Sequence, residues 1–207
     1  MGKKIIITGG LGYIGTELCK IYSGYSWNDN ITVIDNRFIS ERVNQLRSWN
    51  INFIHGDILD KELIRNHCRE ADIIHHLAGI THVPRVKSES KNEEDEKIKL
   101  IAEQGTQNIL DSISNKCKII MPSTHVVYEG ISEIKKEILE DEITAPVLSY
   151  AKSKDFNEQQ LKNSGKNYVI LRLGSVYGYS GDTMRIDIMP NLFSKITSQN
   201  GTLKLFS

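Results

Sequence analysis

The amino-acid sequence predicts an α/β fold built on a doubly wound parallel sheet flanked by helices, and two observations carry this prediction. Short runs of β-branched apolar residues alternate along the chain with stretches whose apolar residues recur at helical spacing. The first run, residues 5–8, leads into a turn that contains Gly9, Gly12 and Gly15. Because no repeat or low-complexity linker interrupts the alternation, we expect parallel strands with helices on both faces. Right-handed crossovers would place a ligand crevice at the carboxyl ends of the strands.

The glycine-rich turn between the strand at 5–8 and a helix at 13–22 suits an anion. Its glycines allow a sharp reversal, close approach of backbone N–H groups to a ligand, and tight packing of the helix on the strand. The helix N-terminus adds free N–H donors and partial positive charge, which suit a pyrophosphate. The alternative is an ordinary glycine-rich turn, and the residues downstream decide between the two.

The second strand is expected at 31–34 and ends at Asp35, about 20 residues beyond the last glycine of the turn. In a dinucleotide-binding fold, a carboxylate here can accept hydrogen bonds from both ribose hydroxyls and repel a 2′-phosphate. We favour this role over simple capping of the next turn because the glycine turn lies upstream. Arg37 follows soon after, which leaves some tolerance of NADP open.

A helix around 41–49 leads to a third strand at 52–55, and Asp57 follows at the end of that strand. A carboxylate in this place could accept a hydrogen bond from the adenine amino group. The competing interpretation is N-capping of a helix at 60–69, which Asp60 would serve equally well.

The fourth strand is expected at 72–77, and the small residues Ala78 and Gly79 after it would let a cofactor lie across the strand ends. The charged run at 87–99 mixes both signs, so we expect a solvated helix start or loop there and not a binding patch. Apolar residues at helical spacing then predict a long helix at 98–113.

The fifth strand is expected at 118–121, and a polar loop follows as far as Pro146. A helix from 149 to 165 and a sixth strand at 168–171 complete the alternation of strands and helices.

Tyr150 and Lys154 lie four residues apart, so a helix places both on one face. A free tyrosine titrates near ~10 and is a poor base at neutral pH, but a nearby ammonium group favours the phenolate and lowers its pKa. Tyr150 could then exchange a proton with a hydroxyl or carbonyl, and Thr124, just past a strand end, could donate to the same oxygen. The alternative is an ordinary Tyr/Lys pair on a solvated helix face.

Composition and charge exclude several classes of partner. The chain of 207 residues has 26 Lys plus Arg and 26 Asp plus Glu, so its net charge of zero gives no basis for binding nucleic acid or an anionic membrane. No apolar run approaches the ~20 residues that a bilayer requires, and no signal peptide is evident, so we expect a cytoplasmic protein. Three widely spaced cysteines form no disulfide framework, and no histidine pair has metal-ligand spacing, so no metal is expected.

Taken together, these residues closely resemble the extended short-chain dehydrogenase/reductase superfamily, specifically the NAD-dependent epimerase/dehydratase family that acts on nucleotide sugars. The resemblance covers nearly the whole chain. The motifs that carry it are Thr8-Gly-Gly-Leu-Gly-Tyr-Ile-Gly15, Asp35, Gly56-Asp57, His76-Leu-Ala-Gly79, Gly105-Thr106, Ser123-Thr124, Tyr150 with Lys154, and Leu171-Arg-Leu-Gly-Ser-Val-Tyr-Gly178.

The resemblance implies a Rossmann-like NAD-binding domain over residues 1–174, with NADP less favoured, and the start of a small, apparently truncated substrate lobe over 175–207. It implies Thr124, Tyr150 and Lys154 as a catalytic triad. The residues that it implies for cofactor binding are Gly9, Gly12, Tyr13, Ile14, Asp35, Asn36, Asp57, Ile58, Leu77, Ala78, Gly79, Ser123, Tyr150 and Lys154. Those that it implies for the nucleotide-sugar substrate are Thr81, Thr124, Ser175 and Asn191. It also implies a homodimer formed through the long helices at 98–114 and 149–164.

Two departures from the family pattern bear on the reaction. His125 and Val126 follow Thr124, where 4,6-dehydratases of the family carry an acid pair and similar decarboxylases a glutamate. Both of those activities are therefore disfavoured. Ala102 stands where the family often has an asparagine. We expect an NAD-dependent epimerase or ketoreductase/dehydrogenase of a nucleotide-activated sugar, and the alternative is a non-catalytic NAD(P)-binding regulator or scaffold.

Overall fold

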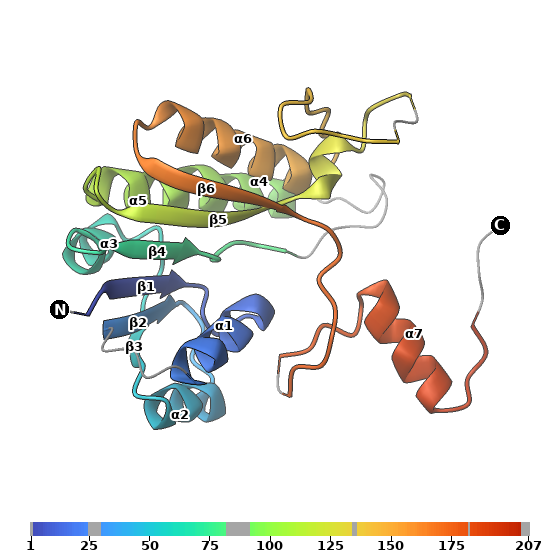
Figure 1. Cartoon of the computed structure of the whole chain (residues 1–207), viewed down its shortest axis with the longest axis horizontal. Coiled ribbons are helices and arrows are strands. Elements are labelled where there is room, and N and C mark those ends of the chain that lie inside the picture. The colour runs from blue at the N-terminus through green and yellow to red at the C-terminus, as the bar shows by residue number, and fades with distance from the viewer. Residues whose placement is uncertain (1, 25–29, 82–91, 134–135, 182, 204–207) are drawn as a thin grey trace.

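All six strands of the computed structural model lie parallel in one sheet with the order β3-β2-β1-β4-β5-β6 (Figure 1). The structure describes residues 2–24, 30–81, 92–133, 136–181 and 183–203. The strands are β1 (Lys4–Thr8), β2 (Asn30–Asp35), β3 (Asn52–His55), β4 (Ile73–His76), β5 (Lys118–Thr124) and β6 (Asn167–Leu173). The predicted doubly wound sheet is confirmed, and its order reverses between β1 and β4, where such folds bind ligands.

Helices follow the strands as predicted. They are α1 (Tyr13–Gly24), α2 (Ser40–Ser48), α3 (Lys61–Cys68), α4 (Asn92–Leu100), α5 (Thr106–Ser112), α6 (Ser149–Asn163) and α7 (Met189–Ser198). The long helix expected at 98–113 begins earlier, with α4, and contains a π-helical turn at Ile101–Gly105. The charged run from Glu93 to Lys99 forms the mostly exposed first part of that helix, as expected, and residues 87–91 lie outside the described residues.

The two faces of the sheet carry separate hydrophobic cores, because successive strand residues point to opposite faces. Ile5 and Ile7 pack on the face covered by α1 and α2, whereas Ile6 packs on the face covered by α3, α5 and α6. This explains why β1 is apolar without alternation. The three cysteines are free and buried, and burial raises the pKa of Cys19 and Cys68 to about 12 and that of Cys117 to about 11.

The packing of α1 on the glycine turn leaves no room at Gly15. A Cβ atom there would lie 2.6 Å from both the Cα of Gly10 and the carbonyl oxygen of Gly9, whereas a Cβ at Gly24 in the same helix meets nothing within 4 Å. We expect Gly15→Ala to lower the free energy of unfolding by about 1–3 kcal/mol through overpacking. The matched Gly24→Ala should leave it unchanged or raise it by up to about 1 kcal/mol. Urea denaturation of both variants measures this difference, and equal effects would contradict it.

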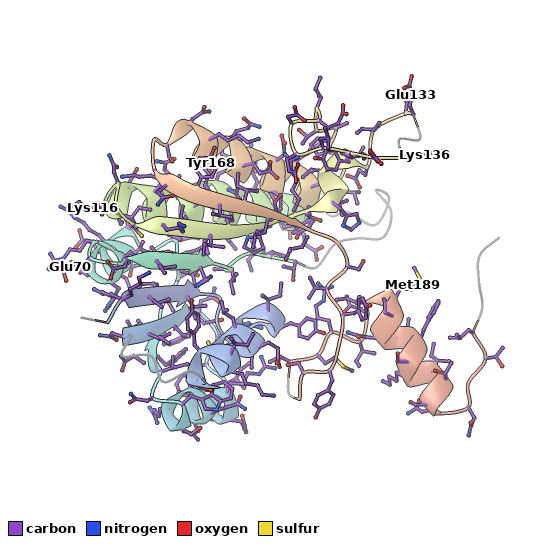
Figure 2. All side chains as sticks on the ribbon, in the orientation of Figure 1. Glu70, Lys116, Glu133, Lys136, Tyr168 and Met189 are labelled. Carbon is purple, nitrogen blue, oxygen red and sulfur yellow. The ribbon has the colours of Figure 1, made fainter. Side chains whose placement is uncertain are left out.

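After β6 the chain leaves the sheet and returns to α1 before it enters α7, which lies apart from the sheet (Figure 1). Tyr13 donates to the carbonyl oxygen of Gly178 at 2.6 Å, and Ser180 donates to the Glu17 carboxylate at 2.5 Å. Figure 2 shows Met189 at the start of α7 and Tyr168 on the edge strand β6. The last strand, β6, ends at Leu173, and the division of the chain at 174/175 into a cofactor domain and a substrate lobe stays a prediction. In the described parts of the chain, every helix is too short or too polar to cross a bilayer.

Candidate active site

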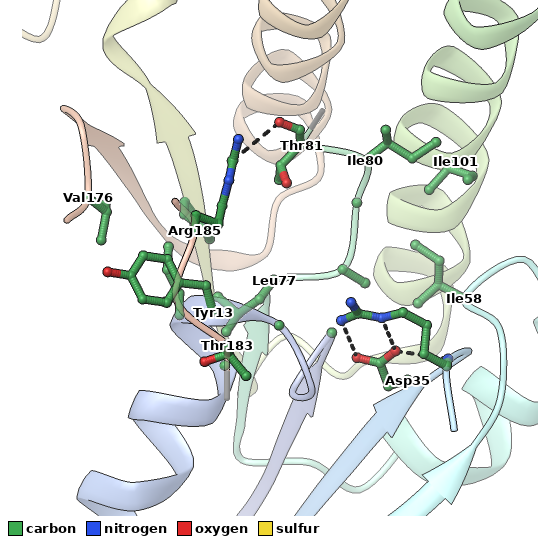
Figure 3. A pocket seen from close by; sticks show the side chains of 18 of the residues that line it. Tyr13, Asp35, Ile58, Leu77, Ile80, Thr81, Ile101, Val176, Thr183 and Arg185 are labelled. Atoms are coloured by element: carbon green, nitrogen blue, oxygen red, sulfur yellow. Dashed lines mark hydrogen bonds and ion pairs between the residues drawn. The ribbon is translucent and has the colours of Figure 1, made fainter. Parts of the chain in front are cut away.

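A cavity of about 690 Å³ opens at the carboxyl ends of the strands (Figure 3). Every residue predicted to bind a cofactor lines it, as do the predicted catalytic residues Thr124, Tyr150 and Lys154. Of the residues predicted to bind substrate, Thr81, Thr124 and Ser175 line the cavity and Asn191 does not. The fold therefore brings residues from the ends of all six strands together around one cavity. The residues that line this cavity are spread along the sequence from Gly9 to Ile188.

The glycine turn forms a narrow cradle at one side of this cavity. Gly9 has φ +71°, and a Cβ there would lie 2.7 Å from the backbone nitrogen of Ala78 after β4. The Gly12 N–H donates to the Gly9 carbonyl at 3.0 Å and closes the turn just before α1. The start of α1 then faces the cavity with Tyr13 and Ile14, where a helix has N–H groups without intrahelical partners. This geometry fits a phosphate or pyrophosphate group.

Asp35 lies at the end of β2 with only 5% of its surface exposed, and the Arg37 side chain contacts its carboxylate. The backbone N–H groups of Leu11 and Arg37 each donate to this carboxylate at 3.0 Å, and the Arg37 guanidinium forms an ion pair with it at 3.3 Å (Figure 3). The carboxylate is therefore held rigidly toward the cavity. Any ribose hydroxyl that binds Asp35 has to displace the arginine side chain, which is half exposed.

The structure separates the two roles considered for Asp57 and Asp60. Asp60 caps α3 by accepting the Leu63 N–H at 3.0 Å. Asp57 lines the cavity and accepts hydrogen bonds from the Asn36 side chain and the Leu59 N–H, both at 2.9 Å. Asp57 and Asn36 thus form one polar edge of the cavity, next to Ile58.

Tyr150 and Lys154 occupy successive turns of α6 and reach the cavity beside Thr124, the last residue of β5. Lys154 Nζ donates to the carbonyl oxygen of Pro122 at 3.0 Å, and desolvation lowers the pKa of this lysine to about 8. The sequence predicts a lowered pKa for Tyr150, but the structure gives the opposite direction: burial raises the pKa of Tyr150, and nearby Arg185 only partly opposes this. Burial of the phenol is the dominant cause, and the ammonium group of Lys154 does not offset it because it is directed to the Pro122 carbonyl.

Arg185 is a cavity residue that the sequence interpretation missed. It pairs with Asp187 at 2.5 Å and donates to the carbonyl oxygen of Thr81 at 3.4 Å, so it joins the segment after β6 to the loop after β4 (Figure 3). No local pattern marks it as a cavity residue, because the Thr81 carbonyl that it contacts across the cavity lies 104 residues earlier in the sequence. Asn191 supports this segment from outside the cavity: its side-chain amide accepts from the Gly178 N–H and donates to the Arg185 carbonyl.

His75 and His76 face opposite sides of β4, as the sequence predicts. His75 bonds to the Tyr22 hydroxyl of α1 at 2.8 Å, whereas His76 lies between the hydroxyls of Thr8 and Thr106 at 2.9 and 3.0 Å. Burial, with a smaller contribution from Lys154, lowers the pKa of His76 to about 3.

The buried His76 predicts a pH-dependent stability. The folded state takes up a proton near pH 3 and the unfolded chain near ~6.5. The unfolded state therefore binds more protons in between, and stability present above pH ~6.5 is lost as the pH falls, by up to about 1.4 kcal/mol per unit. His76→Gln removes this titrating group, so the free energy of unfolding should depend less steeply on pH, by the contribution of up to one proton. Urea denaturation between pH ~7 and ~4 tests this, and identical slopes in both proteins would contradict it.

Comparison with known proteins identifies the family of this chain. The family model described as "NAD dependent epimerase/dehydratase family" matches residues 5–207. The chain belongs to the NAD-dependent epimerase/dehydratase family. The family that was predicted from the sequence motifs is thereby confirmed.

Relatives within this family differ in the reaction for which they are named. The chain is 30% identical to dTDP-D-glucose 4,6-dehydratase of Dictyostelium discoideum, over 85% of this chain and 44% of the relative. It is 28% identical to UDP-glucose 4-epimerase of Mycoplasma genitalium, over 95% of this chain and 61% of the relative. The crystal structure of Bacillus cereus UDP-glucuronic acid 4-epimerase in complex with UDP-glucuronic acid and NAD matches with a TM-score of 0.74 and 26% identity, over 99% of this chain and 66% of that chain.

These similarities support the family and the fold, and they do not separate an epimerase from a dehydratase. The chain spans only 44% of the length of the Dictyostelium relative and 61% of the Mycoplasma relative. Its activity, substrate and partners therefore have to be inferred from the residues of the site.

Proposed function

We propose that this chain forms the cofactor-binding and catalytic part of an NAD-dependent enzyme that oxidises a hydroxyl group of a nucleotide-activated sugar, with epimerisation as the favoured outcome. One observation carries the proposal. Thr124, Tyr150 and Lys154 line the same cavity as the glycine turn and Asp35. A proton-transferring group and a dinucleotide cradle thus share one space.

The residues present fit NAD. The cradle at Gly9 and the start of α1 suit the pyrophosphate, because a Cβ at Gly9 would close the turn onto Ala78. Asp35 suits the adenosine ribose, and the polar edge formed by Asn36 and Asp57 suits the adenine. When bound, the cofactor supplies a hydride acceptor and returns the same hydride. We propose NAD in preference to NADP because a 2′-phosphate would meet the Asp35 carboxylate.

Tyr150 is the proposed acid and base. It removes the proton of the sugar hydroxyl while the hydride on that carbon leaves, so that the substrate becomes a ketone. Thr124 donates a hydrogen bond to the same oxygen. Lys154 stabilises the Tyr150 phenolate, which requires its ammonium group to turn away from the Pro122 carbonyl. Return of the hydride to the opposite face, with Tyr150 returning the proton, gives the epimer; a single transfer gives net oxidation or reduction.

The residues after Thr124 disfavour dehydration and decarboxylation. Elimination of water needs a carboxylic acid or equivalent near the leaving hydroxyl. His125 is exposed, bonds to the carbonyl oxygen of Leu173 at 3.2 Å and does not line the cavity, and Val126 cannot donate a proton. We therefore favour an epimerase or reductase although a dehydratase is among the relatives.

A non-catalytic NAD(P)-binding regulator is the second candidate, and Ala102 favours it. This residue lies in the π-helical turn, and its carbonyl oxygen accepts a hydrogen bond from Asn157 of α6 at 2.9 Å. Its methyl side chain offers no polar group to a proton relay. We also propose a cytoplasmic homodimer, formed through the helical stretch at 98–114 and through α6, where the apolar residues Leu100 and Phe156 are 54% and 43% exposed.

A panel assay tests the proposed function. The purified chain is incubated with NAD and a set of UDP- and dTDP-sugars, and products are separated by chromatography and identified by NMR. We expect a change of configuration at one carbon, or a ketone, for at least one sugar. Binding of NAD without conversion of any sugar would favour the regulator, and formation of a 4-keto-6-deoxy sugar would favour a dehydratase.

A further inference from the structure

A buried ion pair lies directly behind the proposed catalytic residues. Glu158 of α6 has no exposed surface, and its carboxylate accepts two hydrogen bonds from the guanidinium of Arg172 on β6, at 2.9 and 2.6 Å. The same carboxylate accepts a hydrogen bond from the Ser123 hydroxyl of β5 at 2.6 Å. Burial opposes the charge of Glu158, but the hydrogen bonds from Arg172 and Ser123 together outweigh it and lower the pKa of Glu158.

Arg172 is itself fixed from several sides. Its guanidinium lies 5.1 Å from the centre of the Tyr128 ring, contacts the Tyr128 hydroxyl, and donates to the carbonyl oxygen of Glu140 at 2.9 Å. Its backbone pairs in register with Ser123 on the neighbouring strand. The ion pair therefore joins β5, β6, α6 and the turn that follows Thr124.

The place of Glu158 in α6 gives this network a consequence for the site. Tyr150, Lys154 and Glu158 follow one another at intervals of four residues, which places them along one face of the helix. Two consecutive residues of β5 bond to that face: Pro122 accepts from Lys154, and Ser123 donates to Glu158. When Lys154 turns from Pro122 toward a bound cofactor, the bond of Ser123 to Glu158 still holds the strand end against the helix.

We propose that Glu158 is a positioning residue for Thr124, Tyr150 and Lys154, and that its carboxylate, clamped by Arg172, holds the end of β5 against α6 through Ser123. Its importance for turnover rests on the proposed function, whereas its effect on the surroundings of Tyr150 requires only that the chain binds NAD. Glu158 touches neither the cavity nor the reacting atoms, so it acts only through these neighbours.

The test uses Glu158→Gln in protein labelled with 3-fluorotyrosine, whose fluorine brings the phenol pKa into a range where the protein stays folded. In the wild type and in each variant, the ¹⁹F NMR signal of Tyr150 is assigned as the signal that disappears when Tyr150 is replaced by phenylalanine. The titration is carried out with NAD bound, because in the unliganded chain the Lys154 ammonium group bonds to the Pro122 carbonyl and not to the phenol. We expect Glu158→Gln to raise the Tyr150 ionisation midpoint by about one pH unit or more relative to the wild type, because Lys154 is then no longer held beside the phenol. Loss of the Glu158 negative charge alone would lower the midpoint, so the sign separates positioning from simple electrostatics.

Two further variants keep the test decisive. Lys162→Met removes the partly exposed lysine that lies 3.5 Å from the same carboxylate, and it should leave the midpoint unchanged. The double variant Glu158→Gln/Arg172→Met leaves no unpaired buried charge, so it should fold well even where the single variant does not. We expect the raised midpoint to persist in it. A midpoint that is unchanged or lowered in the folded double variant would overturn the proposal.

Turnover is a second measurement, and it distinguishes failure of the proposed function from failure of the positioning role of Glu158. With a sugar that the wild type converts, Glu158→Gln should lower kcat about tenfold or more while KM stays nearly constant. If the wild type converts no sugar, the proposed function fails and the ¹⁹F NMR titration still decides the role of Glu158.

Discussion

Replacing Tyr150 with phenylalanine is expected to abolish turnover of the sugar and leave NAD binding nearly unchanged. The change removes one hydroxyl from a half-buried side chain and keeps the ring that packs against the cavity wall. General acid–base catalysis contributes typically about 10²–10⁴ to the rate, so kcat should fall by roughly that factor. The measurement pairs kcat, on a sugar that the wild type converts, with the NAD dissociation constant from calorimetry.

Tyr168→Phe is the matched control for this variant. It makes the same chemical change on the edge strand β6, at the end of the sheet opposite to the cavity, where Tyr168 is 37% exposed. We expect full activity from it. If Tyr150→Phe lost cofactor affinity and turnover in equal measure, Tyr150 would be a structural residue and the proposed acid–base role would be wrong.

Asp35→Asn is expected to produce the second largest effect, a change in cofactor preference. The Asp35 carboxylate has only 5% of its surface exposed and is fixed by the Leu11 N–H, so it can accept hydrogen bonds from ribose hydroxyls once the Arg37 side chain has moved aside. Hydrogen bonds to a charged group contribute about 1.5–3 kcal/mol, so NAD affinity should fall roughly 10- to 150-fold. NADP affinity should rise, because Arg37 loses its partner and becomes available to the 2′-phosphate.

The neighbouring Asp60→Asn controls for the loss of an aspartate charge in this region. Asp60 caps α3 and does not line the cavity, and asparagine caps a helix about as well as aspartate. Calorimetric titration of both variants with NAD and NADP should show altered preference only for Asp35→Asn. An unchanged ratio of the two affinities in Asp35→Asn would place the ribose elsewhere.

The strand–helix alternation was enough to predict the sheet and the position of its ligand crevice. Each β-branched run between glycines or polar residues became a strand, because only a doubly covered parallel sheet buries residues such as Ile5, Ile6 and Ile7 on both faces. The glycine turn, Asp35, and the Tyr150 and Lys154 pair were recognisable because their spacing within a strand end or a helix face is local. Such spacing places side chains without knowledge of the rest of the fold.

What the sequence did not reveal depends on contacts between distant segments. Arg185 meets Thr81, and Arg172 meets Glu158, only after the strands have been ordered in the sheet. The direction of the Tyr150 pKa was predicted wrongly for a related reason. The spacing to Lys154 was visible, whereas the burial that raises the pKa and the Pro122 carbonyl that holds the lysine were not. The π-helical turn likewise has no pattern in the charged and apolar residues around it.

Calorimetric titration of the unmodified chain with NAD and with NADP tests the proposed cofactor site most directly. We predict saturable binding of one NAD per chain, with NADP at least about tenfold weaker, because both the glycine cradle and the Asp35 carboxylate are formed in the folded chain. Binding of NADP as tight as that of NAD would contradict the role given to Asp35. Absence of binding by either dinucleotide would contradict the proposed site as a whole.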